Sequence, residues 1–294
     1  MSETRERRSL PGLLTAEQIE RFQRDGYLLV ENALTAQETA HYRAAILDLV
    51  PPGLSLPPHW RVMDGRIKPY LPHRDQTINT PALIPLMGNE TLYHVMAQLH
   101  GTPRLHAFDG SVGITLRNDA RPDEVLSQRL HLDASVPPEK DFLFTAEELQ
   151  LGGCYYLTDV EQDGGGIHVV PQGHRLVEEE VRSARARGVN SRSLHGSWRN
   201  ITHHRSVEVT GPAGSFVLMH HLMPHAASHN RRSLARIAYF MRYVRTPHAH
   251  GAHLPELPGG REYDAAQLGA MTPLTRRLLG LDPWDRTRGE PEGV

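Results

Sequence analysis

Short apolar runs separated by turn-forming residues fill the middle of the chain. Four of these runs have the length and the β-branched or aromatic content that is typical of buried strands; they span residues 111–117, 152–160, 215–219 and 237–244. Clusters of glycine, proline, asparagine and serine separate them. We therefore expect a mainly β fold with a sheet at its centre.

Helices are expected on both sides of this sheet region. Thr15 and Thr35 can each cap a helix, the first running to about residue 25 and the second through residue 49. A third helical stretch at 90–99 ends at Gly101. The arginine-rich segment 176–204 is expected to be helical in its first half and a loop in its second. Together these elements predict a mainly β protein with flanking helices.

The composition is that of a globular protein. The 294 residues carry a formal net charge of −2 and no apolar run of membrane-spanning length, so we expect no binding to nucleic acid or membranes. Cys154 is the only cysteine, which excludes an intramolecular disulfide and favours a cytoplasmic location. We interpret residues 1–11 as a disordered tail and 12–294 as a single domain, either monomeric or homodimeric, with a C-terminal extension from about residue 246.

His131 and Asp133 are the first candidates for chemistry. Side chains two residues apart on a β-strand project from the same face, so this imidazole and carboxylate can bind one metal ion. One more imidazole would complete a set of two histidines and one carboxylate, which suits non-haem Fe(II) and leaves coordination positions open. The same spacing occurs at His73 and Asp75. That pair lies in a polar, proline-punctuated stretch typical of a loop, so we prefer His131 and Asp133, which lie between predicted strands.

A second candidate region follows the predicted strand at 215–219. It contains His225 and, eleven residues further on, Arg236 at the start of the next predicted strand. We expect a hairpin in which both side chains face one cavity. The planar guanidinium of Arg236 could then hold a carboxylate through two parallel hydrogen bonds, which lysine cannot do. The two regions together would supply three metal ligands and an anchor for a dicarboxylic cosubstrate.

In the order and spacing of these residues the chain resembles the phytanoyl-CoA dioxygenase family of Fe(II)/2-oxoglutarate-dependent oxygenases. The likeness covers about residues 12–245, and it includes the opening segment 14–27, the turn Asp163-Gly-Gly-Gly followed by Pro171 and His174, and the interval from His225 to Arg236. It implies a double-stranded β-helix, a jelly-roll or cupin-like fold. It further implies that Fe(II) binds to His131, Asp133 and His225, that 2-oxoglutarate binds to Arg236, and that dioxygen is a cosubstrate.

Two positions bear on the reaction that the resemblance implies. Members of the family often carry a serine two residues after the second histidine ligand, where its hydroxyl helps to hold the cosubstrate. Here that residue is Ala227, and the adjacent Ser228 is the candidate in its place. Related halogenases replace the carboxylate ligand with a small residue so that chloride can bind iron. Because Asp133 is present, halogenation is not expected.

The resemblance predicts an enzyme that hydroxylates an unactivated C–H bond of a small metabolite or natural-product intermediate. An acyl-CoA is the second choice of substrate, and epimerisation, cyclisation or desaturation are alternative outcomes at the same site. Two other classes stay open: a non-catalytic, metal-free cupin-like binding module, and a zinc hydrolase with the same ligands. A binding module has no need for all four of His131, Asp133, His225 and Arg236, and a zinc hydrolase leaves Arg236 unexplained.

Residues near these motifs have less defined roles. His220 lies within a predicted strand and not at its end, so we expect it to pack in the core. His174 follows the proline turn and is expected to hold that turn by hydrogen bonding. Among Cys154, Tyr155 and Tyr156, alternate side chains must face the cavity of the fold, but the sequence leaves their register open.

Overall fold

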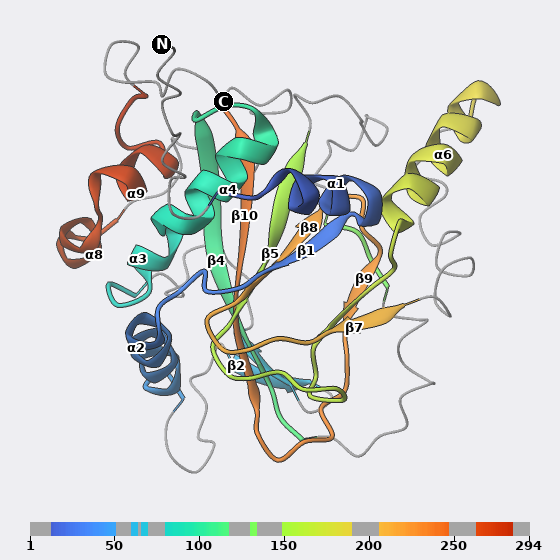
Figure 1. Ribbon diagram of the computed structural model, residues 1–294. Coiled ribbons are helices and arrows are strands. Elements are labelled where there is room, and N and C mark those ends of the chain that lie inside the picture. Colours follow the sequence, from blue (N-terminus) through green and yellow to red (C-terminus); the bar gives the residue numbers. More distant parts are fainter. Residues whose placement is uncertain are drawn as a thin grey trace, which may run out of the picture.

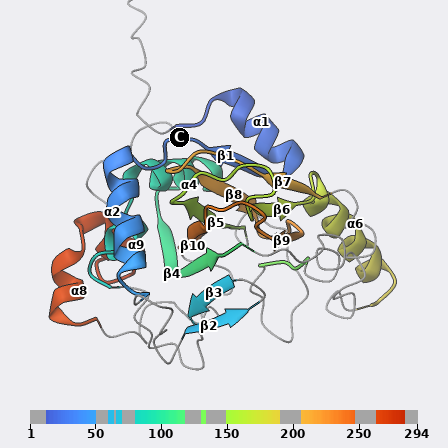
Figure 2. The same ribbon diagram turned by 90° about the horizontal axis from the view of Figure 1, so that it is seen from below.

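The structure is a computed structural model that describes residues 13–50, 60–63, 66–69, 80–117, 130–133, 149–189, 206–246 and 263–284. Its described residues form two β-sheets with helices around them (Figures 1 and 2). The large sheet has the strand order β1-β8-β5-β10-β4-β3-β2, and the small sheet has the order β7-β6-β9. The strands pair antiparallel throughout both sheets. The expected mainly β fold with flanking helices is therefore confirmed.

Four of the strands coincide with the predicted apolar runs, although β4 begins six residues before its run. The large sheet contains β1 (Tyr27–Val30), β2 (Trp60–Met63), β3 (Arg66–Pro69), β4 (Leu105–Thr115), β5 (Gln150–Tyr156), β8 (Phe216–His220) and β10 (Arg236–Arg245). The small sheet contains β6 (Ile167–Val169), β7 (Val207–Val209) and β9 (His225–Ala227). One expectation is wrong: β8 and β10 do not form a hairpin, because β5 lies between them. After β8 the chain crosses to the small sheet, pairs there as β9 with β6, and only then returns as β10.

Capping side chains set the starts of the first helices. The helices are α1 (Ala16–Asp25), α2 (Ala36–Leu47), α3 (Ile84–Met87), α4 (Glu90–His100), α6 (Gly173–Ala186), α8 (Ala265–Ala270) and α9 (Pro273–Leu278). The Thr15 and Thr35 hydroxyls accept from backbone N–H groups three residues on, and the side chains of Gln18 and Glu38 accept in return, as the capping-box pattern predicts. Gly101 ends α4 with a φ of +64°. None of the described helices is long and apolar enough to cross a lipid bilayer.

The main hydrophobic core lies between the large sheet and the helices. In Figure 2 the helices α2, α8 and α9 lie on one side of this sheet, and the small sheet lies on the other. Tyr155 and Tyr239 are fully buried in the main core. A second core cluster fills the space between the sheets, and Cys154 and Tyr156 belong to it together with Ile167 of β6. The register of β5 therefore directs Cys154 and Tyr156 toward the small sheet and Tyr155 toward the helices.

The C-terminal part of the described chain packs on the large sheet. Leu278 of α9 is fully buried, and the Trp284 indole N–H donates to the Leu105 carbonyl at 3.1 Å. The buried side chain of Thr275 lies under Gly88, which follows α3. Residues 263–284 thus share the main core. The predicted tail at 1–11 lies outside the described residues, and the division of the chain into one domain with an extension stays a prediction.

Candidate metal centre and cosubstrate site

Residues 130–133 carry the H-x-D sequence on a short extended segment beside β9. The His131 N–H donates to the His225 carbonyl at 2.9 Å, and the His225 N–H donates to the His131 carbonyl at 3.1 Å. The expected strand at His131 is thus reduced, in the described residues, to a single antiparallel bridge. The bridge suffices to bring the two imidazole rings together, with their centroids 4.3 Å apart.

The Asp133 carboxylate lies against both imidazoles. Its Oδ1 is 3.6 Å from His131 Nε2, and its Oδ2 is 3.5 Å from His225 Nε2. One potential ligand atom from each of the three residues lies within 4.8 Å of the others, and no other such group occurs among the described residues. Atoms that share a metal ion at about 2.1 Å are separated by about 3 to 3.5 Å, so the three side chains need only small shifts to hold one ion.

Hydrogen bonding fixes the His225 ring for this role. His225 is buried, and its Nδ1 lies 2.9 Å from the Met223 carbonyl. That carbonyl can only accept, so Nδ1 carries the proton and Nε2 is the nitrogen that faces Asp133. Met223 could not be identified from the sequence, because it contributes a backbone atom.

The charges of the centre are strongly coupled in the metal-free protein. Burial lowers the pKa of His225, but the adjacent Asp133 carboxylate and the Met223 carbonyl outweigh it and raise the pKa above its usual value. Burial likewise raises the pKa of Asp133, yet His225, Arg242 and His131 together bring it well below the usual range. Asp133 is therefore ionised, as a metal ligand must be.

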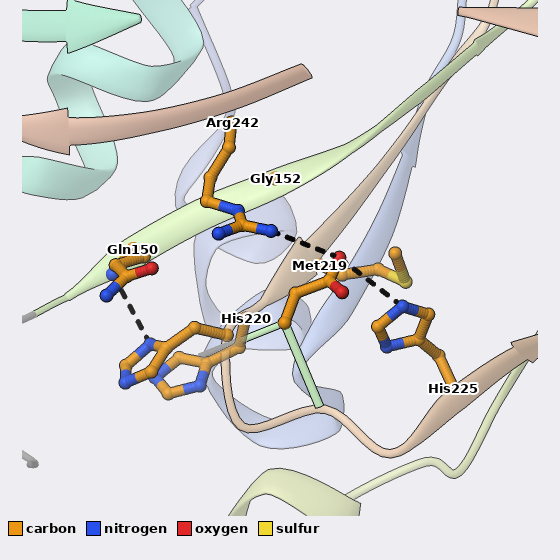
Figure 3. Close-up of a pocket in the computed structure, with 8 residues that line it drawn as sticks. Gln150, Gly152, Met219, His220, His225 and Arg242 are labelled. Carbon is orange, nitrogen blue, oxygen red and sulfur yellow. Dashed lines mark hydrogen bonds and ion pairs between the residues drawn. The ribbon is translucent and has the colours of Figure 1, made fainter. Parts of the chain in front are cut away.

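A pocket of about 220 Å³, its open mouth included, adjoins the centre. Arg242 of β10 reaches across β5 at Gly152 into this space, with Gln150 and His220 on one side and His225 on the other (Figure 3). We call it the Arg242 pocket, and its lining consists of Asp133, Gln150, Gly152, Met219, His220, His221, His225 and Arg242. Two of the predicted metal ligands, Asp133 and His225, thus line this space.

His220 departs in part from the expectation that it packs in the core. It is partly buried and stacks on His221 with a centroid distance of 4.4 Å, but it also lines the Arg242 pocket. Burial and the neighbouring imidazoles, His221 first among them, lower its pKa well below the usual range, which keeps it neutral at pH 7. His174 packs beside it at 5.2 Å, and its Nε2 lies 3.3 Å from the Gln23 carbonyl of α1.

Arg236 begins β10 and is buried, with 2% of its surface exposed. Its Nη2 donates to the Thr115 hydroxyl at 2.8 Å, and its guanidinium carbon lies 5.8 Å from the centre of the Phe240 ring. Nε and Nη1 have no hydrogen-bond partner among the described residues. Because leaving buried donors unpaired is costly, two such atoms on one guanidinium indicate a place for an acceptor.

Ser228 lies at the end of β9 and has partners already. Its hydroxyl donates to the Gly166 carbonyl at 2.8 Å and lies 3.2 Å from a Glu208 oxygen. Glu208 also accepts from the N–H groups of Asp163 and Gly166 and so ties the glycine turn to β7. A role for Ser228 in cosubstrate binding stays a prediction, and these contacts assign it a structural role in the turn.

The other H-x-D pair, His73 and Asp75, lies outside the described residues. Sequence reasoning did not assign a role to Arg242 or Gln150, although both line the pocket beside the centre. A signal for Arg242 was present: it interrupts an apolar strand and lies six residues after Arg236, so the two side chains share a face of β10. No comparable signal marks Gln150, which is the first residue of β5.

A family model for phytanoyl-CoA dioxygenase (PhyH) matches residues 22–238. The chain belongs to the phytanoyl-CoA dioxygenase family. This confirms the family that the motifs predicted, and with it the expected class of Fe(II)- and 2-oxoglutarate-dependent oxygenases. No sequence among the curated proteins matches significantly.

Several solved structures are similar to the chain. SnoN, an α-ketoglutarate-dependent epimerase from nogalamycin biosynthesis, is 20% identical with a TM-score of 0.55, over 84% of this chain and 90% of SnoN. EctD from S. alaskensis, crystallised with 2-oxoglutarate and 5-hydroxyectoine, is 18% identical with a TM-score of 0.53, over 79% and 76% of the two chains. HygX from Streptomyces hygroscopicus is 16% identical with a TM-score of 0.53, over 79% and 88%. These similarities confirm the jelly-roll fold.

Proposed function

We propose that the protein hydroxylates an unactivated C–H bond of a small metabolite or natural-product intermediate, using Fe(II), 2-oxoglutarate and dioxygen. The observation that carries the proposal is the meeting of His131, Asp133 and His225, whose potential ligand atoms lie within 4.8 Å of one another. Two imidazoles and one carboxylate suit non-haem iron and leave coordination positions for other ligands. Family membership supports the same assignment.

The residues present also fit 2-oxoglutarate. The buried Nε and Nη1 of Arg236 can donate in parallel to one carboxylate, while Nη2 keeps its hydrogen bond to Thr115. A dicarboxylate whose far end reaches Arg236 would satisfy both donors and neutralise a buried charge. A zinc hydrolase does not account for these two N–H groups, and a metal-free binding module does not account for the convergence of His131, Asp133 and His225, so the oxygenase is the better explanation.

The protein's part in the reaction is to bind and to position. When bound, Fe(II) with 2-oxoglutarate would supply the activation of dioxygen and the oxidising power that C–H cleavage requires. Met223 holds the His225 ring so that Nε2 faces the metal position. Asp133 would hold the metal at the position that a halide would otherwise need, which favours hydroxylation over halogenation. The Arg242 pocket would hold the prime substrate beside the centre, so its shape decides which hydrogen is within reach.

Other outcomes at the same site are distinguished by the product. The fold is shared with SnoN, described as an epimerase, and with SnoK, described as a carbocyclase, so the fold does not select hydroxylation. An acyl-CoA substrate is the alternative to a small metabolite.

A cytoplasmic location and a monomeric or homodimeric state stay predictions.

The experiment is a succinate-release screen against a panel of metabolites, followed by mass spectrometry of the product formed under ¹⁸O-labelled dioxygen. We expect succinate release that depends on a fitting substrate, and a product that carries one labelled oxygen. Asp133→Ala should abolish both. A product without the label would replace hydroxylation by another oxidative outcome, whereas activity supported by zinc without dioxygen would contradict the oxygenase assignment.

A further inference from the structure

The Arg242 pocket contains a cation that the proposed chemistry does not use. Arg242 is the only arginine or lysine among the described residues that line it. Its side chain is 26% exposed, and its Nη2 is 3.8 Å from Asp133 Oδ2. That separation permits an ion pair but is longer than a hydrogen bond, so Arg242 does not hold the Asp133 carboxylate in place by donating to it.

The neighbouring strand makes room for this side chain. Gly152 of β5 pairs with Arg242, and a Cβ built on Gly152 would lie 3.4 Å from Arg242 Cγ and 3.1 Å from the Met241 carbonyl. A Cβ at position 152 would press on the Met241 carbonyl and touch the stem of Arg242, so glycine leaves the space beside that stem open. The guanidinium carbon lies 5.7 Å from the centre of the Phe108 ring, which supports one side of the group. Glycine and the aromatic ring thus direct the guanidinium into the pocket (Figure 3).

The balance of charges favours an anion at this position. With Fe(II) and 2-oxoglutarate bound, the positive charges of Fe(II) and Arg236 would be balanced by the negative charges of Asp133 and 2-oxoglutarate. Coordination also draws the Asp133 charge toward the metal, which weakens its pull on Arg242. Arg242 then contributes one positive charge to the described lining of the pocket. A monoanion matches that charge better than a phosphate dianion does.

We propose that Arg242 binds a carboxylate of the prime substrate, so the enzyme acts on a small carboxylic acid. The inference rests on the proposed function, because it takes the Arg242 pocket as the place of the prime substrate. A guanidinium offers two parallel donors to a carboxylate. Held there, the substrate lies between Arg242 and the metal position at Asp133 and His225, with Gln150 and His220 on the opposite side.

The test uses Ni(II) in place of Fe(II), with saturating 2-oxoglutarate, so that no turnover occurs and 2-oxoglutarate occupies its own site. The probes are phenylacetate, 4-phenylbutanoate and hexanoate, each compared with its primary amide, and phenyl phosphate. Broadening of the probe's proton resonances by the paramagnetic Ni(II) reports binding close to the metal. The variants are Arg242→Gln, Arg242→Lys and, as a matched control on the same strand, Arg245→Gln.

We expect at least one acid to bind about tenfold or more tightly than its amide, the scale of one charge-assisted hydrogen bond. Arg242→Gln should abolish the preference, Arg242→Lys should keep part of it, and Arg245→Gln should leave it unchanged. An acid preference that survives in Arg242→Gln, equal binding of acids and amides by the wild type, or no acid binding at all would overturn the proposal. Tighter binding of phenyl phosphate would overturn the choice of a carboxylate.

Calorimetry before the probes are added separates this inference from the proposed function. If the wild type binds Ni(II) and 2-oxoglutarate but shows no acid preference, only the role of Arg242 fails. If it binds neither, the proposed function fails and the inference fails with it. Circular dichroism and thermal unfolding show whether the Arg242 variants are folded, and Arg242→Lys keeps the test valid if Arg242→Gln is not.

Discussion

Replacing Arg236 should separate cosubstrate binding from folding. The guanidinium is buried, one nitrogen donates to Thr115, and two have no partner among the described residues. Arg236→Lys keeps the positive charge but has only one nitrogen. That nitrogen cannot replace both Nη2, which donates to Thr115, and the two nitrogens that would donate to the carboxylate. We expect the loss of about one charge-assisted hydrogen bond, 1.5 to 3 kcal/mol, which weakens 2-oxoglutarate binding by about 10- to 150-fold.

Arg236→Met should affect the stability of the protein differently without and with bound 2-oxoglutarate. In the metal-free protein without 2-oxoglutarate it removes a buried charge whose donors are unsatisfied, and such replacements are often neutral or stabilising by about 1 to 4 kcal/mol. The free energy of unfolding should therefore hold or rise. With 2-oxoglutarate the wild type should gain about 2.7 kcal/mol at a ligand concentration of 100 Kd, and the variant should gain almost nothing.

Chemical denaturation with and without 2-oxoglutarate, in the presence of Ni(II), measures both effects. Metal affinity, followed by calorimetry, serves as the control and should hardly change in either variant. If Arg236→Met is strongly destabilised without ligand, Nε and Nη1 have a partner in the protein itself. If it keeps the stabilisation by 2-oxoglutarate, Arg236 is not the anchor.

Two further predictions concern the core and the pH dependence. The buried Tyr156 hydroxyl donates to the Val209 carbonyl at 2.8 Å and accepts from the Ile167 N–H at 2.9 Å. Tyr156→Phe removes both hydrogen bonds, so the free energy of unfolding in urea should fall by about 2 to 4 kcal/mol. Tyr243→Phe loses only one hydrogen bond; it is the control and should lower the free energy of unfolding by less. Because the pKa of His225 is raised, protons compete with the metal at a higher pH than for an ordinary histidine, and affinity for Ni(II) should fall by up to about tenfold per pH unit below that pKa. In the metal-free protein the contribution of the charged His225 to stability runs the other way: it is complete below the usual histidine pKa and is lost as the pH rises through the raised value. A flat affinity between pH 8 and pH 6 would contradict the coupling of His225 to Asp133.

Local chemistry is what the sequence predicts best. The capping boxes at Thr15 and Thr35 and the glycine after α4 involve residues within one turn of each other, so their pattern is complete in the sequence. The apolar runs likewise predict β4, β5, β8 and β10, because a buried strand has the same composition whichever strand it pairs with.

Pairing between distant strands is what the sequence leaves undetermined. The two apolar runs around His225 suggest a hairpin, but β8 and β10 each pair with β5, which lies between them. The consequence for the site is that His225 comes from the small sheet and Arg236 from the large one. The role of Arg242 depends on the same pairing, because only the opposition of Gly152 shows that its side chain has room to enter the pocket.

The central claim is that His131, Asp133 and His225 hold the iron, and an anaerobic Fe(II) titration tests it most directly. The chain supplies its own matched control, because a second H-x-D sequence stands at His73 and Asp75. We predict that the wild type and Asp75→Ala each bind one Fe(II) per chain, and that Asp133→Ala binds it at least about 10-fold more weakly. Retention of iron by Asp133→Ala together with its loss from Asp75→Ala would contradict the account.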